Sequence, residues 1–339
     1  MKPNFSTRYG AIYQCDSLEH IRETVKDASI DLILTSPPFG LLRKKDYGNV
    51  DAEKYVQWFE SFAREFYRIL KPSGSLVIDI GGSWTPGQPT RSLYHFELLI
   101  MLCRKMKFYL AQEFYWWNPS KLPTPAEWVT VRRIRVKDAV NCVFWLSKTP
   151  WPKASNRRVL APYSESMKDL LKNGYKPKLR PSGHDISDKF TTNNGAAIPP
   201  NLIALPNTES NSHYLRYCQT HGLKPHPARF PAQLPEMFIR MLTDKGDVVL
   251  DPFAGSCVTG EVCEQLGRKW ICCEVLEEYV LSAIGRFASD RKGNGKQKVP
   301  EFYKIFSPAT LWDRDDGIFD ETLSTDGGSK RNLAHHRAH

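Results

Sequence analysis

Residues 248–260 read Val-Val-Leu-Asp-Pro-Phe-Ala-Gly-Ser-Cys-Val-Thr-Gly, and this stretch carries the strongest indication of the fold. An apolar run typical of a buried strand ends at Asp251, small residues follow at 254–256, and a helical pattern begins at 258. In doubly wound α/β proteins the crevice after such a strand binds a nucleotide-like ligand. The loop lacks the Gly-x-Gly-x-x-Gly pattern of pyrophosphate sites, but its small residues let a ligand lie against the backbone.

The next strand along the chain, predicted at 269–273, leads into Glu274, nineteen positions after Gly255. An acidic residue at that separation is placed to bond the two hydroxyls of a ribose. The alternative is an ordinary βαβ unit with a solvated glutamate. The sequence therefore favours a nucleoside site at this edge of a parallel sheet.

The same alternation of strands and helices runs through most of the chain, which predicts one doubly wound, mostly parallel α/β sheet. We expect two halves of this domain, residues 1–150 and 226–288, separated by a region at 151–225 that is rich in Pro, Asn, Ser and Lys. Residues 289–339 form a polar tail that we expect to be flexible. The predicted strands are 11–15, 31–35, 75–80, 110–117, 139–147, 247–250 and 269–273, and the predicted helices are 17–27, 52–70, 91–106, 231–243, 258–266 and 277–288.

A second informative segment, Thr-Ser-Pro-Pro-Phe at 35–39, directly follows the strand-like run 31–34. Two successive prolines stiffen the backbone and remove two N–H donors, and Ser36 is pushed toward an extended conformation. The resulting corner presents a hydroxyl, a free carbonyl and the aromatic face of Phe39. Taken alone, a Pro-Pro dipeptide more often only marks a turn.

Composition narrows the function classes. The chain has 339 residues, a net charge of +10 and no apolar run approaching the length of a membrane span. Its eight cysteines form no Cys-x-x-Cys pair, which favours a reducing cytoplasm over disulfides or structural zinc, and we expect no metal site. The positive charge suggests a polyanionic partner.

The two segments together resemble those of the amino-group DNA methyltransferases. The segment 35–39 precedes the loop 251–256, and this order is similar to the circularly permuted β-type arrangement of that family. Further matches in the expected order are Cys15-Asp16-Ser17, the turn 70–76 and His226-Pro-Ala-Arg-Phe-Pro231. The resemblance covers roughly residues 11–280. It implies a class I methyltransferase fold with S-adenosyl-L-methionine as cofactor.

The serine at the first position of the tetrapeptide resembles the cytosine-N4 enzymes of restriction–modification systems, whereas adenine-N6 relatives usually carry Asp or Asn there. Segments 115–123 and 180–186 also look like that N4 group. One departure is Cys257, which stands where the family often has Gly. Adenine-N6 methylation is the nearest alternative, and a non-catalytic DNA-binding protein on this fold is another.

The resemblance assigns roles to individual residues. Ser36 and the Pro37 carbonyl would accept hydrogen bonds from the cytosine amino group, and Phe39 would stack on a base flipped out of the duplex. We expect Asp79, at the end of its strand, to act as base or proton relay, the alternative being a cap for the Gly81-Gly82 turn. The expected catalytic residues are Ser36, Pro37, Pro38, Phe39 and Asp79, and the expected cofactor residues are Asp16, His226, Phe230, Asp251, Phe253, Ala254, Gly255, Ser256 and Glu274.

Basic residues gather in loops with interleaved aromatic residues, a mixture that suits phosphate contacts and base stacking. The resemblance makes double-stranded DNA the partner, with residues 151–225 as the target-recognition region. A cognate restriction endonuclease, action as a monomer and a cytoplasmic location are further expectations. The candidate DNA-binding residues are Arg43, Lys44, Lys45, Arg132, Arg133, Arg180 and His184.

Overall fold

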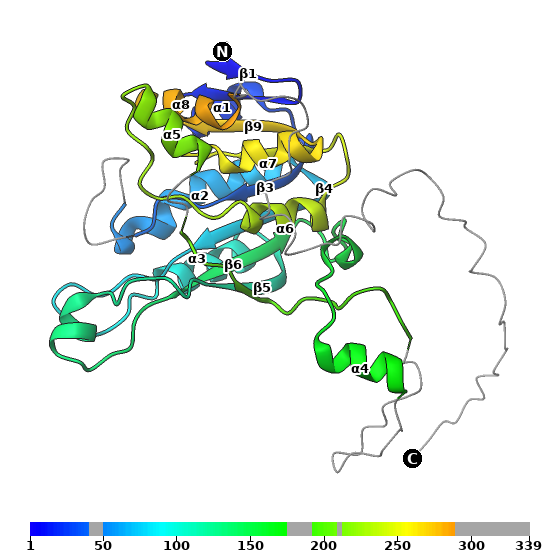
Figure 1. Ribbon diagram of the computed structural model, residues 1–339. Helices are drawn as coiled ribbons and strands as arrows, with labels where there is room; N and C mark the ends of the chain where they lie inside the picture. Colours follow the sequence, from blue (N-terminus) through cyan, green and yellow to red (C-terminus); the bar gives the residue numbers. More distant parts are fainter. Residues whose placement is uncertain (41–49, 175–191, 209–211, 289–339) are drawn as a thin grey trace, which may run out of the picture.

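A sheet of nine strands forms the centre of the computed structural model, which describes residues 1–40, 50–174, 192–208 and 212–288 (Figure 1). The strand order is β1-β2-β9-β8-β3-β4-β6-β5-β7. Only β1 and β6 run against the other strands, so the predicted mostly parallel sheet is confirmed. The strands are β1 (Phe5–Ser6), β2 (Gly10–Gln14), β3 (Ile30–Thr35), β4 (Leu70–Ile80), β5 (Tyr109–Trp117), β6 (Val140–Ser147), β7 (Leu202–Ala204), β8 (Val248–Asp251) and β9 (Lys269–Glu274).

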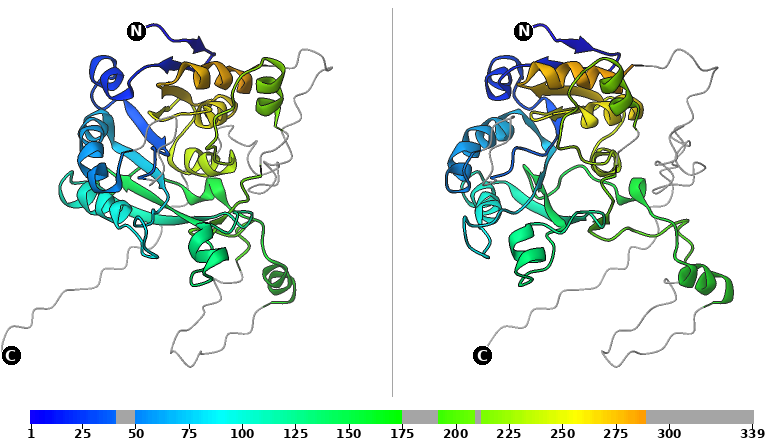
Figure 2. Two further views of the ribbon diagram at one scale, coloured as in Figure 1. Left: turned by 90° about the vertical axis from the view of Figure 1, so that its left-hand side faces the viewer. Right: turned by 60° about the vertical axis from the view of Figure 1, so that its left-hand side comes forward.

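Helices cover both faces of the sheet, as the two views of Figure 2 show. One face carries α1 (Ser17–Thr24), α2 (Ala52–Ile69) and α3 (Tyr94–Arg104), and the other carries α6 (Gln233–Leu242), α7 (Val258–Leu266) and α8 (Glu277–Ala283). Every residue of β3 is buried, and its side chains alternate between two cores: Leu32 and Leu34 pack with α6 and α7, while Ile33 packs with α2 and α3. Burial on both faces explains why the central strands read as continuous apolar runs.

The helix α2 shows how the sequence pattern sets the packing. Its buried side chains Tyr55, Phe59, Phe62, Phe66 and Ile69 recur at spacings of three and four residues, which place them along one side of the helix. These side chains all belong to the core on that face of the sheet. Full burial of such side chains stabilises a fold by about 1.5–3 kcal/mol each.

Differences from the prediction lie mainly at helix ends and in the region 151–225. The predicted helix 277–288 divides into α8 and a short 3₁₀ turn, η4 (Ile284–Arg286). Within 151–225 the described residues form η2 (Asn156–Val159), α4 (Glu165–Asn173), β7 and α5 (His213–Thr220), and none of these elements is predicted from the sequence pattern. β7 extends the sheet beside β5, and Tyr214 in α5 hydrogen-bonds to Ser282 in α8 at 3.0 Å. The proposed domain boundaries stay a prediction.

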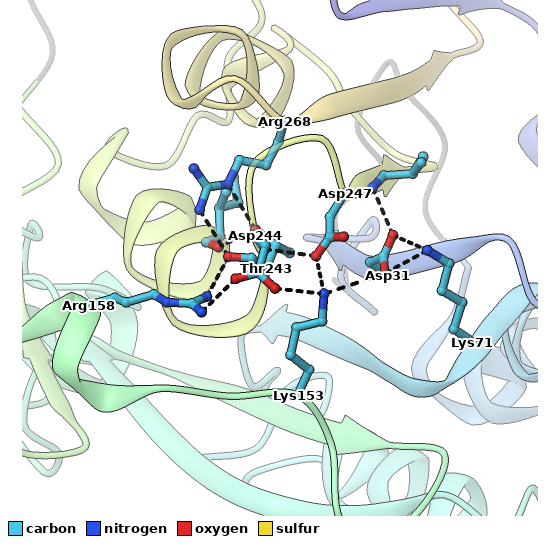
Figure 3. Close-up of polar contacts among 10 residues, drawn as sticks. Asp31, Lys71, Lys153, Arg158, Thr243, Asp244, Asp247 and Arg268 are labelled. Atoms are coloured by element: carbon cyan, nitrogen blue, oxygen red, sulfur yellow. Dashed lines mark hydrogen bonds and ion pairs between the residues drawn. The ribbon is translucent and has the colours of Figure 1, made fainter. Parts of the chain in front are cut away.

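An ion-pair cluster joins several segments at the edge of the sheet where β3 and β4 begin (Figure 3). Lys153 pairs with Asp247 at 2.5 Å and with Asp244 at 3.1 Å, and Lys71 bonds both carboxylate oxygens of the buried Asp31 at 2.7 and 2.8 Å. Arg158 continues the cluster to Asp244 at 2.6 Å. The start of the region 151–225 is therefore fixed to the turn that precedes β8.

Candidate active site

The candidate site is a cavity of about 630 Å³ at the carboxyl ends of the parallel strands, on the side of the sheet away from the ion-pair cluster of Lys153. β2 leads into Asp16, β3 into Ser36, β8 into Pro252, and β4 and β9 carry Asp79 and Glu274 near their ends. β6 runs in the opposite direction, so its first residues lie at this edge too. Residues from both predicted halves meet here, and the lining includes Ser36, Pro37, Pro38, Phe39, Asp79, Asp16, His226, Phe230, Phe253, Ala254, Gly255, Ser256 and Glu274.

Ser36 and Asp79 form a hydrogen-bonded pair on the cavity wall. The Ser36 hydroxyl donates to Asp79 Oδ2 at 3.0 Å, and Asn141 Nδ2 donates to Asp79 Oδ1 at 3.1 Å. Burial raises the pKa of Asp79 to about 6, although the hydrogen bonds from Asn141 and Ser36 act in the other direction. Because its hydrogen is directed at Asp79, the Ser36 oxygen has lone pairs left to accept a hydrogen bond from a ligand in the cavity.

The prolines and Phe39 complete this part of the wall. Pro37 is buried, whereas Pro38 and Phe39 are partly exposed to the cavity. A Cβ on Gly81 would lie 2.6 Å from the ring of Phe39, so the ring occupies space that only a glycine leaves open. The Gly81 carbonyl accepts a hydrogen bond from the Tyr94 hydroxyl. The Asp79 carboxylate accepts hydrogen bonds from Ser36 and Asn141, which lie outside this turn.

The loop after β8 and the end of β9 form the second part of the cavity. Glu274 Oε2 accepts from the Gly255 amide and Oε1 from the Leu276 amide, each at 3.0 Å. Burial raises the pKa of Glu274. Gly255 has a φ of +53°, and a Cβ there would approach the His226 ring to 3.1 Å. The backbone of this loop is therefore bare toward the cavity, as a ligand lying flat against it requires.

His226 and Asp16 border the same space. The backbone amide of His226 donates to the Tyr214 hydroxyl at 2.8 Å, and its ring lies edge-on to Tyr279 with centroids 4.4 Å apart. Burial lowers the pKa of His226 to about 4, so the ring is neutral at physiological pH. Asp16 caps α1 by accepting from the amides of Leu18 and Glu19 through one oxygen, Oδ1, at 2.9 and 3.1 Å.

Asp251 is the one expected cofactor residue that does not line the cavity. Its carboxylate points inward, where Oδ1 accepts from the Thr35 hydroxyl at 2.8 Å and Oδ2 from the Thr259 hydroxyl at 2.6 Å. Oδ1 also accepts from the Phe253 amide at 3.2 Å. Burial raises the pKa of Asp251 to about 6. The Asp251 carboxylate thus joins the segment 35–39 to the loop 252–259, and its expected role in cofactor binding stays a prediction.

Cys257, which departs from the family pattern, is fully buried in the left-handed conformation at φ +59°. This conformation costs a non-glycine residue about 1–2 kcal/mol, which explains the preference for Gly at this position. The thiol does not line the cavity. A cysteine instead of a glycine at position 257 therefore does not obstruct ligand binding along this loop.

Several residues that line the cavity are not among the site residues predicted from the sequence. Asn141 is the most informative, because it holds Asp79 from the neighbouring strand β6. Asn118 and Lys121 follow the end of β5, and Trp58 of α2 lies beside Phe253 with ring centroids 5.8 Å apart. Asn118 and Lys121 could have been predicted as site residues, because they follow the end of a strand that is parallel to the central ones. Asn141 could not, because its position beside Asp79 depends on the register between β6 and β4.

The candidate DNA-binding residues divide into two groups. Arg132 and Arg133 are exposed on a segment between β5 and β6, whereas Arg43, Lys44, Lys45, Arg180 and His184 lie outside the described residues. Among the residues that the structure describes, no cluster of three or more His, Cys, Asp or Glu side chains could hold a metal ion. No helix in this part of the chain is long and apolar enough to cross a membrane.

These features define a class of protein: an α/β enzyme with a nucleoside-sized crevice beside a Ser–Asp pair. The family profile of the DNA methylases matches residues 30–285, and the chain belongs to this family. It is 52% identical over 305 residues to the type II methyltransferase M.PvuII of Proteus hauseri, covering 89% of this chain and 90% of the relative.

A second relative, the type II methyltransferase M.BamHI of Bacillus amyloliquefaciens, is 28% identical over 97% of this chain and 71% of its own length. Among solved structures, the PvuII DNA methyltransferase, described as cytosine-N4-specific, superposes with a TM-score of 0.71 at 46% identity. The match covers 86% of this chain and 91% of that one. The doubly wound methyltransferase fold predicted from the sequence is thus confirmed.

Proposed function

We propose that this protein transfers a methyl group from S-adenosyl-L-methionine to the exocyclic N4 of cytosine in double-stranded DNA. It is a site-specific DNA methyltransferase of the type II restriction–modification group, like M.PvuII. The observation that carries the N4 assignment is the Ser36–Asp79 pair at the cavity wall, where the serine stands at the first position of the tetrapeptide.

The residues and the volume of the cavity are suited to binding S-adenosyl-L-methionine. The bare backbone at Gly255, the carboxylate of Glu274 and the neutral ring of His226 lie along one wall, and Asp16 lies on the adjoining one. The Glu274 carboxylate accepts from the Gly255 and Leu276 amides, and a carboxylate has about four lone-pair sites, so sites remain for the hydroxyls of a ribose. A volume of about 630 Å³ is within the range of small-molecule sites. When bound, S-adenosyl-L-methionine supplies an electrophilic methyl group on its sulfonium.

The protein's own groups then position the base and remove a proton. Ser36 Oγ and the Pro37 carbonyl accept hydrogen bonds from the amino group of cytosine, which directs the nitrogen lone pair toward the methyl carbon. The N4–carbon bond forms as the sulfur–carbon bond breaks, so catalysis rests on positioning and electrostatics. The proton released from N4 passes by way of Ser36 Oγ to Asp79 Oδ2, which lies 3.0 Å away.

Phe39 and Asn141 support this arrangement. Phe39 borders the cavity with part of its ring exposed and would stack on the extruded base, which offsets the cost of removing that base from the duplex. Asn141 holds the second Asp79 oxygen, so the carboxylate keeps one orientation toward Ser36.

The cellular context follows as a set of further proposals. Methylation by this enzyme would protect DNA from a cognate restriction endonuclease, as befits a relative of type II methyltransferases. One chain supplies all the cavity groups named above, which supports action as a monomer. Residues 151–225 would read the target sequence, and the protein would act in the cytoplasm of a bacterium or archaeon.

Analysis of the methylated product tests the assignment. DNA is incubated with the protein and isotope-labelled S-adenosyl-L-methionine, digested to nucleosides and separated by chromatography. We expect label in N4-methylcytosine, and no label in a parallel reaction with Ser36→Ala. Label found only in N6-methyladenine would establish the adenine alternative, and cofactor binding without transfer to any DNA would favour the non-catalytic reading.

A further inference from the structure

Residues 118–138 form an arm that projects beyond the sheet between β5 and β6, at the lower left of Figure 1. It contains the short π-helical turn η1 (Glu127–Val131). Three of its aliphatic side chains are more exposed than a folded protein usually leaves them: Val136 is 87% exposed, Leu122 75% and Val131 69%. Several exposed aliphatic residues on one projecting segment indicate an interaction surface.

The arm is held to the domain by polar contacts. Asp138 forms an ion pair with Arg91 and accepts a hydrogen bond from Trp84 Nε1 at 3.2 Å. Arg135 Nε donates to the Pro89 carbonyl at 3.1 Å. Because these contacts tie its base to the loop after β4, the arm presents its aliphatic side chains in a fixed place.

The arm also folds back on itself near the cavity. Lys137 Nζ donates to the carbonyls of Pro119 and Lys121 at 3.0 and 3.1 Å, which closes the base of the arm. Asn118 and Lys121 at its start and Ala139 just beyond its end line the cavity of Ser36 and Asp79. The arm therefore begins and ends beside the cavity.

The charge of the arm identifies its partner. Its 21 residues include five basic and two acidic ones, and both acidic side chains are already paired, Glu127 with Arg132 at 2.7 Å and Asp138 with Arg91. Arg133 is exposed in a left-handed conformation at φ +55°. An excess of positive charge beside exposed aliphatic groups matches proteins that press apolar side chains against bases while basic side chains hold phosphates.

We propose that this arm contacts duplex DNA beside the flipped cytosine, with Leu122, Val131 and Val136 against the bases or sugars and Arg133 on the phosphate backbone. The proposal rests on the proposed function, because it presumes that DNA enters this cavity. It assigns the arm a part in opening the duplex: apolar contacts next to the vacated position offset the free energy that unstacking costs.

The apolar contacts are tested with the full-length double variant Val131→Ser/Val136→Ser, compared with Ile100→Ser. Ile100 is 59% exposed on α3, outside the arm. With plasmid DNA that the wild-type protein methylates, we expect kcat/KM to fall about tenfold, or about 1.4 kcal/mol, in the double variant only. Affinity for S-adenosyl-L-methionine should not change, because neither valine lines the cavity.

The phosphate contact is tested with Arg133→Gln against Arg104→Gln, a similarly exposed arginine at the end of α3. Removing one phosphate contact lowers the slope of log affinity against log salt by about one, and we expect this only for Arg133. A double valine variant within about twofold of the wild type would overturn the proposal. So would a wild-type dimer that the valine substitutions dissociate, since the arm would then be a self-association surface. A wild-type protein that methylates no DNA would instead refute the proposed function.

Discussion

Replacing Asp79 by asparagine should make the protein more stable and less active at once. Burial raises the pKa of Asp79 from 3.8 to about 6, so the folded state holds a proton that the unfolded chain releases between these values. Stability conferred by the protonated form is complete below 3.8 and is lost as pH rises to 6. The shift of about two pKa units means that ionising the buried Asp79 lowers the free energy of unfolding by roughly 3 kcal/mol at neutral pH.

An asparagine at this position carries no charge, so it avoids that cost. Its carbonyl can accept from Ser36, and its amide can donate to Asn141 once the Asn141 amide group turns over. We therefore expect Asp79→Asn to raise the free energy of unfolding by about 1–3 kcal/mol at about pH 8, and to change it little near pH 4. Turnover should fall by a factor of about 10²–10⁴, the range for a lost general base, with unchanged cofactor affinity.

The assay combines urea unfolding at both pH values with methyl transfer to DNA. The exposed Asp169 in α4 provides a matched control, because Asp169→Asn should change stability by less than about 0.5 kcal/mol at either pH. In the wild type, kcat should rise with pH through about 6 as Asp79 ionises. An Asp79→Asn variant that is no more stable than the wild type at pH 8, or that keeps wild-type turnover, would refute the reasoning.

Three further substitutions probe other parts of the structure. Gly255→Ala places a Cβ 3.1 Å from the His226 ring, so calorimetry should show that the affinity for the cofactor falls about tenfold. The control is Gly267→Ala, because Gly267 also has a positive φ but a Cβ there would have nothing within 4 Å. This variant should bind the cofactor as the wild type does. Phe39→Ala should remove about 1–3 kcal/mol of stacking on the base and raise KM for DNA, and an unchanged KM would exclude the stacking role. Lys153→Met should lower the free energy of unfolding by about 1 kcal/mol, and the loss should shrink in about 1 M salt, whereas a salt-independent loss would point to packing.

The fold was predictable because its signals are local. Buried parallel strands read as apolar runs, and the segments 35–39 and 251–256 each follow such a strand. Parallel strands that end at one edge bring the residues that follow them together, so the sequence alone predicts that most of the expected site residues lie near one another, as they do in the cavity. This prediction needs only two facts about the sheet: the order of its strands, and the common direction of β2, β3, β4, β8 and β9.

The remaining site features depend on contacts that no local pattern records. Asn141 reaches Asp79 only because β6 runs antiparallel to β4 in a particular register, which pairs Asp79 with Val143. The elements β7 and α5 are short and lie in a stretch of weak periodicity, so their sequence did not distinguish them from loop. Their place beside β5 and α8 is fixed by tertiary packing.

Asp251 and Asp79 show why a residue type and a raised pKa do not by themselves assign a role. Both carboxylates are buried, both have a pKa of about 6, and both lie at the end of a central strand. Asp251 receives hydrogen bonds from Thr35, Thr259 and the Phe253 amide and is closed off from the cavity, so its charge serves to hold the loop. Asp79 lines the cavity and accepts a hydrogen bond from the Ser36 hydroxyl, which is the contact that the proposed proton transfer requires. The path to the cavity, which only the packed structure reveals, separates the carboxylate that holds the loop from the one that we propose for proton transfer.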